Sequence, residues 1–140
     1  MTRRSLVIRS IWATCLLIGA ANHARILLRH GLCWDYGGVS WASSFYWSSL
    51  TILDPLVAAL LFLRPKIGIA STLVLIVSNV IHNLAVTSQR ATASEIFSAV
   101  ASSPSVLLQI GFMIFVVSTA RIAWEGAVRT PIPKPPNMLA

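Results

Sequence analysis

The chain has few charged residues and no long polar segment before its C-terminal tail. Aspartate and glutamate together number four in 140 residues, and charged side chains make up 11% of the sequence. An average soluble domain has about 25%. The helices of a soluble domain of this length need polar faces toward water, and these segments have almost none. The composition therefore excludes an ordinary water-soluble globular fold.

Cysteine and the signatures of common soluble enzymes are also scarce. Cys15 and Cys33 lie at depths too different for a disulfide, and no metal-type spacing occurs. The sequence contains no GxSxG, P-loop, HExxH or dinucleotide-binding motif. Enzymatic activity is therefore not indicated. A reaction on a lipid or isoprenoid, with His82 or Asp54 as acid or base, stays open.

Apolar residues are abundant, at 56% of the chain with a mean hydropathy of +0.75. They form four segments, each near the roughly 20 residues that a helix needs to cross a bilayer. These segments cover about residues 6–28, 41–63, 67–86 and 104–124. The sequence predicts an all-α integral membrane protein, a four-helix bundle in one domain over residues 1–128. A proline-rich cytoplasmic tail follows at 129–140.

The basic residues predict an orientation. If all four segments span, one side carries Arg3, Arg4, Arg9, Arg64, Lys66, Arg121, Arg129 and Lys134, and the other carries Arg25, Arg29 and Arg90. This asymmetry places both termini in the cytoplasm of a multi-pass protein, in a bacterial-type inner membrane. Alternatively, Gly19-Ala20-Ala21 marks the cleavage site of a signal peptide, although the arginines just after it resist export. The net charge of +7 does not indicate nucleic acid, because the basic residues sit at segment ends.

Helix-breaking and capping residues divide the chain further. Pro65 predicts a very short cytoplasmic turn between the second and third segments, and Ser103-Pro104 predicts the start of the fourth. Residues 92–95 match a capping box before Ile96, Phe97 and Val100, which predicts a short amphipathic helix on the outer surface. An ordinary loop is the alternative.

Asp54 is the most informative polar residue because a carboxylate inside a membrane needs compensation. Insertion scales give such a group a cost of about 2.5–3.5 kcal/mol. Asp54 precedes Pro55 inside the second segment. It therefore either caps a second half-helix that begins at the proline, or serves as a proton, cation or ligand site.

Histidine and asparagine side chains recur near the outer ends of the first and third segments. Together with Asp54 they suggest an outward-facing pocket lined by Asn22, His23, Trp47, Asp54, Asn79, His82 and Asn83. The same residues could instead only hydrogen-bond neighbouring helices. A third interpretation is a b-type haem with His23 and His82 as axial ligands and an arginine near the propionates.

Three functions follow from these interpretations. The main hypothesis is a small membrane protein whose pocket binds a small or lipidic ligand. The first alternative is an interaction protein, such as an immunity factor or an accessory subunit, with a membrane-protein partner or a second copy of itself. The second is a haem electron carrier. Membrane lipids are expected partners in each case.

Overall fold

The computed structural model describes residues 2–32 and 34–128. Within these ranges the chain is 86% helical and contains no strand. Four helices are long and apolar enough to span a membrane by length and composition. The all-α prediction is therefore confirmed for this part of the chain, while the predicted tail at 129–140 lies outside the described residues.

The helices follow the predicted segments closely. They are α1 (Arg3–His30), α2 (Trp41–Leu63), α3 (Pro65–Arg90), the short α4 (Ile96–Ala101) and α5 (Pro104–Val128). The bounds of α2 match the prediction, whereas α1, α3 and α5 continue past the apolar windows. Hydropathy misses these extra turns because polar residues at a helix end still make backbone hydrogen bonds.

Local chemistry explains where the first helices begin and end. The Thr2 hydroxyl accepts a hydrogen bond from the Ser5 N–H at the start of α1, and Ser40 accepts one from Ser43 at the start of α2. Both are the side-chain caps expected of Ser and Thr. The first helix ends at Gly31, whose φ of +87° lies in the left-handed region that favours glycine.

The turn between α2 and α3 is as short as Pro65 predicted. Arg64 alone separates the two helices, and Pro65 occupies the first turn of α3. Directly after the turn, a Cβ built on Gly68 would lie 2.4 Å from the backbone N of Leu61. Glycine therefore allows the two helix backbones to come into direct contact.

The proline within α2 does not divide the helix. Residues Trp41–Leu63 form one helix with Pro55 inside it. No hydrogen bond joins the Asp54 carboxylate to a backbone N–H among the described residues. The capping role considered for Asp54 is thus not observed, and its carboxylate points toward α1.

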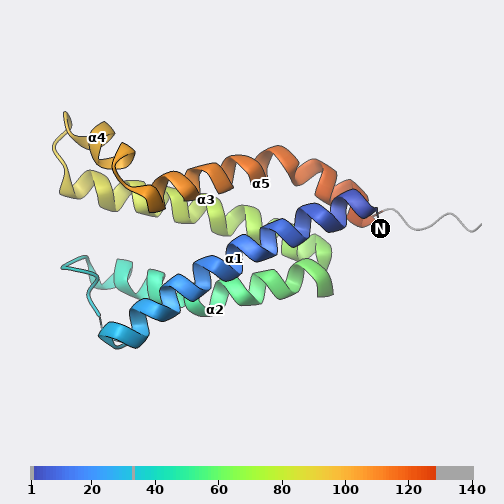
Figure 1. Ribbon diagram of the computed structural model, residues 1–140, viewed down its shortest axis with the longest axis horizontal. Helices are drawn as coiled ribbons and strands as arrows, with labels where there is room; N and C mark the ends of the chain where they lie inside the picture. The colour runs from blue at the N-terminus through green and yellow to red at the C-terminus, as the bar shows by residue number, and fades with distance from the viewer. Residues whose placement is uncertain (1, 33, 129–140) are drawn as a thin grey trace, which may run out of the picture.

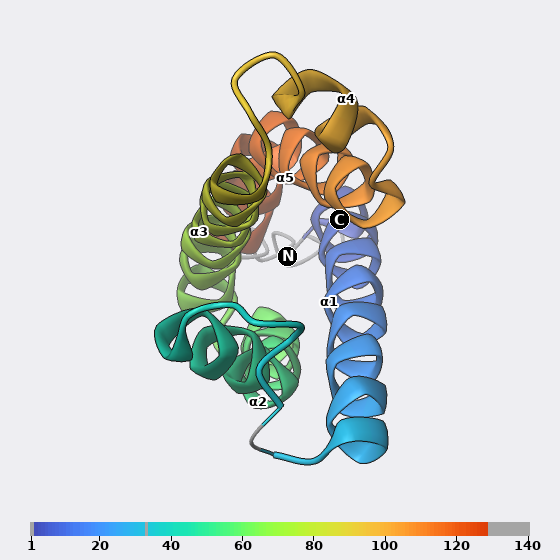
Figure 2. The same cartoon turned by 90° about the vertical axis from the view of Figure 1, so that its left-hand side faces the viewer.

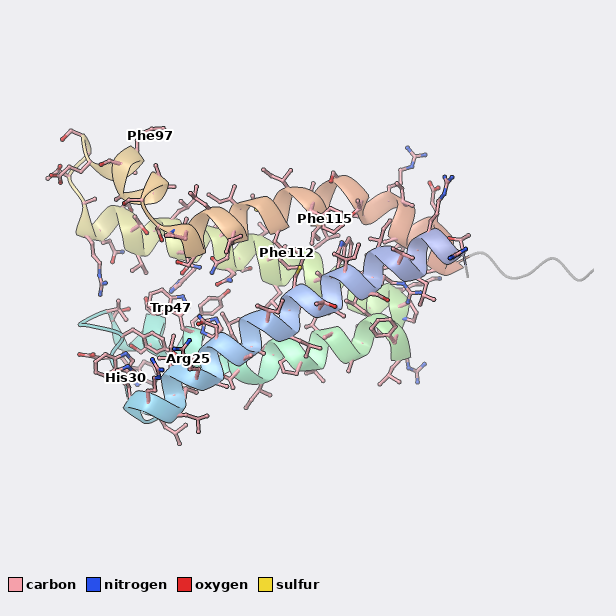
Figure 3. The ribbon with its side chains drawn as sticks, in the orientation of Figure 1. Arg25, His30, Trp47, Phe97, Phe112 and Phe115 are labelled. Atoms are coloured by element: carbon pink, nitrogen blue, oxygen red, sulfur yellow. The ribbon has the colours of Figure 1, made fainter. Side chains whose placement is uncertain are left out.

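A short helix occurs between α3 and α5, as one of the two sequence interpretations predicted. Glu95 accepts hydrogen bonds from the Thr92 N–H at 3.1 Å and from the Thr92 hydroxyl at 2.6 Å. This is half of a capping box, since the hydroxyl donates to the carboxylate and does not cap a backbone N–H. Phe97 is 86% exposed and points away from the long helices (Figure 3).

The long helices lie side by side in a ring, in the order α1, α2, α3, α5 (Figure 2). Each packs against the two next to it in that order. The start of α1, the end of α5 and the α2–α3 turn gather at one end of the molecule (Figure 1). The α1–α2 connection and α4 lie at the opposite end, which we call the loop end.

The densest apolar packing lies in the half of the molecule next to the termini. Trp12, Leu61, Ile69, Val116 and Ala123 are all at most 1% exposed. These residues come from the first third of α1, the end of α2, the start of α3 and the second half of α5. The half nearer the loop end contains most of the buried polar side chains discussed below.

Arg9 is an exception to this apolar packing and corrects one detail of the charge count. The sequence interpretation assigned it to the N-terminal flank, but it lies within α1 and is fully buried. Its guanidinium donates to the carbonyl oxygens of Ser5 and Leu61 and lies 5.9 Å from the centre of the Phe62 ring. Arg9 therefore joins α1 to the end of α2, where helix carbonyls carry partial negative charge.

Candidate functional site

Asp54 lies on the buried face of α2 because of its spacing from the core residues. Leu50, Val57 and Leu61 are buried, and Asp54 falls on the same face by three- and four-residue steps. Its side chain is 6% exposed. Among the described residues it makes no hydrogen bond or ion pair. The packing of the apolar face of α2 thus places the Asp54 carboxylate, which can only accept hydrogen bonds, in the interior.

A cavity of about 120 Å³ lies beside this carboxylate, between all four long helices. We call it the polar cavity. Its polar lining residues are Cys15, Asn22 and His23 from α1, Asp54 from α2, Asn79 from α3 and Gln109 from α5. Four of the seven residues predicted for the pocket are therefore found together around one space. Gly19, Leu16, Leu75, Ile76 and Phe112 complete the wall.

Asn83 lies one helical turn from Asn79, toward the loop end of the polar cavity. It is buried, and its amide NH₂ donates to the side-chain oxygens of Asn79 and Gln109. Its own oxygen accepts from the Trp47 indole N–H at 2.9 Å. These bonds join α2, α3 and α5 across the interior. Asn83 and Trp47 therefore position cavity residues without lining the cavity.

The two histidines of the predicted pocket have different environments. His23 lines the polar cavity, and its Nδ1 is buried without a hydrogen-bond partner among the described residues. The ring of His82 instead packs 4.6 Å from the Tyr46 ring and edge-on at 5.6 Å to Trp47. His82 does not line the cavity. The structure thus does not bring the two imidazoles to a common space.

This geometry gives the haem interpretation no support. A space of about 120 Å³ is much smaller than a porphyrin, and only one of the two proposed axial ligands faces it. The side chains present therefore do not fit the cofactor. Among the described residues there is also no group of three His, Cys, Asp or Glu side chains that could hold a metal ion.

Two cavity residues were missed by the sequence interpretation. Gly19 had been considered only as part of a cleavage site, yet a Cβ there would lie 3.0 Å from Asp54 Oδ2. Cys15 had been considered only as a cysteine that cannot form a disulfide with Cys33. A usable signal existed, because Cys15, Gly19 and Asn22 follow one another by four and three residues and share a helix face.

The residues around Asp54 can act chemically as a small polar binding site. They offer one carboxylate, three amides, an imidazole and a thiol against an apolar wall that includes Phe112. Comparison with known proteins adds no functional assignment to this geometry: no family model matches the chain, nor does any curated protein or solved structure.

Proposed function

We propose that the chain is a multi-pass membrane protein whose polar cavity binds a small ligand that enters from the outer side. Lipid contact is supported by large apolar side chains left exposed at mid-helix positions. Ile18, Ile52, Val74 and Ile114 are between 60% and 73% exposed on four different helices. Large apolar side chains exposed on every long helix are typical of a surface that contacts lipid and are unusual for a soluble monomer.

The proposed orientation has both termini in the cytoplasm. Even without the buried Arg9, the end that contains the start of α1, the end of α5 and the α2–α3 turn carries most of the basic residues outside the core in the described part of the chain. They are Arg3, Arg4, Arg64, Lys66 and Arg121. Arg25, Arg29 and Arg90 belong to the loop end. The positive-inside rule then makes the loop end the outer side, toward which Asn22, His23 and Gln109 of the cavity wall lie.

The observation that carries the binding proposal is the combination of a buried, unpaired Asp54 with an adjacent space. A carboxylate in an apolar interior is costly unless a partner compensates it. The volume of about 120 Å³ lies below the roughly 300–1,000 Å³ of sites for drug-sized molecules. A small polar ligand therefore fits this cavity better than a lipid head group does.

Cys15 allows the access of the cavity to be tested directly. In a Cys33→Ser background, a small charged methanethiosulfonate added to the outer side should modify Cys15, since a water-filled path is needed for reaction. Addition of the low-molecular-mass fraction of a native cell extract should slow this modification. Mass spectrometry of the intact protein measures the rate of Cys15 modification with and without the extract fraction.

A matched control distinguishes the cavity from the lipid-facing surface. Ile18 lies one turn from Cys15 on α1 but is 66% exposed on the surface that we propose contacts lipid. Because the charged reagent does not enter lipid, Ile18→Cys in a Cys15→Ser, Cys33→Ser background should react slowly. Reaction of Cys15 only after unfolding in SDS would overturn the proposal. If loss of cellular function instead follows changes at Trp34, Asp35 or residues 96–100, the interaction hypothesis is favoured.

A further inference from the structure

We propose that the polar cavity is selective for a small cation with N–H donors, either ammonium or a short primary alkylammonium. This inference rests on the proposed binding function and names the chemical class of its ligand. Three features of the cavity carry it: the charge of its wall, the hydrogen-bonding capacity of that wall, and its size.

The charge of the wall favours a cation. Asp54 is the one acidic residue among the described lining residues, and none of them is lysine or arginine. Asp54 is a buried residue, only 6% exposed, and its carboxylate has no ion-pair partner within the described chain. An anion would be repelled by this carboxylate, and a neutral ligand would leave its charge uncompensated.

The hydrogen-bonding groups favour a cation that carries N–H donors. The Asp54 carboxylate accepts only, and the amides of Asn79 and Gln109 each keep a second lone pair beyond the bond from Asn83. His23 Nδ1 is buried without a hydrogen-bond partner in the described ranges, and the unprotonated nitrogen of a neutral imidazole accepts from N–H. A primary ammonium group has three such donors, whereas hard alkali cations prefer all-oxygen sites.

The size and the apolar part of the wall limit the rest of the ligand. The cavity of about 120 Å³ admits ammonium or a short alkyl chain. Phe112 projects from α5 toward the interior and lines the same space (Figure 3). An aromatic face attracts a desolvated cation, and Leu75 and Ile76 can cover a methyl group.

The test uses methylammonium chloride as the probe and measures protection of Cys15 in the Cys33→Ser protein. Methylammonium should slow Cys15 modification at concentrations at which acetamide, a neutral molecule of similar size, and sodium acetate do not. Potassium chloride at equal ionic strength should protect much less. Calorimetric titration of the same protein gives the dissociation constant.

Two pairs of variants make the result specific to the cavity. Asp54→Asn should weaken methylammonium binding by about 30-fold or more, as expected when one partner of a buried charge pair is removed. Asp35→Asn changes an exposed carboxylate in the outer loop and should leave binding unchanged. Gly19→Ala narrows the space beside Asp54 and should weaken methylammonium more than ammonium, whereas Gly111→Ala meets no atom within 4 Å and should have no effect.

The outcomes separate this inference from the proposed function. Suppose that Cys15 reacts, that acetamide and methylammonium protect it equally, and that Asp54→Asn has no effect. This result would overturn the ammonium inference but retain the binding cavity. Cys15 that does not react in the folded protein would overturn both. Should Asp54→Asn fail to fold, the Gly19→Ala and Gly111→Ala pair still decides whether the cation lies beside the carboxylate.

Discussion

Single residues at close helix contacts set the packing of this small protein. Gly68 and Gly126 lie where the added Cβ would meet another element, at 2.4 Å from Leu61 N and 2.3 Å from Thr2 Oγ1, respectively. Gly111 faces open space. All three glycines lie in long helices, but only Gly68 and Gly126 are required for close packing, because only they have atoms of another element where a Cβ would lie.

We predict that Gly68→Ala destabilises the protein by about 1–3 kcal/mol, the usual cost of forcing an extra methyl group into a packed interior. The obstructing atoms belong to the backbone of Leu60 and Leu61 and cannot rotate away. The measurement is the thermal unfolding midpoint in one fixed detergent. Gly111→Ala is the control and should unfold at or slightly above the wild-type midpoint, because alanine favours helix. Equal midpoints for the two variants would contradict the close contact.

At the scale of elements, the segment from Thr92 to α4 depends on one carboxylate. Hydrogen bonds from the Thr92 hydroxyl and backbone N–H hold the pKa of Glu95 below its usual value near 4.5. Because the folded pKa is lowered, the stabilisation is present above about pH 4.5 and is lost as the pH falls through the lowered value. The segment should therefore lose order in acid before the long helices do.

This loss can be followed by the helical ¹³Cα chemical shifts of residues 96–101 between pH 6 and pH 3 in detergent micelles. We expect the wild-type shifts to move toward random-coil values at the acid end. Glu95→Gln keeps an acceptor oxygen without a titrating group, so its shifts should change little over the same range. Identical pH profiles for the two proteins would show that Glu95 does not control α4.

At the scale of the whole molecule, the two halves differ in their packing. Most of the fully buried apolar side chains lie in the half that contains the α2–α3 turn, whereas His23 and Gln109 of the polar cavity and the Asn83 hydrogen bonds lie toward the loop end. In the proposed membrane orientation, the packed half closes the molecule on the cytoplasmic side. Access to the cavity is then expected from the outer side only.

Single-cysteine labelling tests this orientation in a Cys15→Ser, Cys33→Ser background. Ser98→Cys, on the exposed surface of α4, should react with a membrane-impermeant maleimide in intact cells. Lys66→Cys, exposed beside the α2–α3 turn, should react only after the membrane is permeabilised. The reverse pattern would place the termini outside and would require the cavity to face the cytoplasm.

Local features in the sequence predicted much of the fold. Apolar length located four helices, with α2 at the same bounds, and Pro65 and residues 92–95 located a turn and a short helix. The sequence also predicted that Asp54, His23 and Asn79 line a pocket inside the bundle. These predictions succeed because helix length, proline geometry and the cost of polar groups in an apolar segment act over a few residues.

The tertiary structure alone decided which of those polar residues meet. Helix rotation brings His23 to the polar cavity and His82 to Tyr46, although both are histidines at similar distances from their helix ends. Arg9 is buried and not in the flank, and Gly19 makes room for Asp54. Such contacts depend on how four helices pack at once, because a one-residue rotation of any helix turns each of its side chains toward a different neighbour.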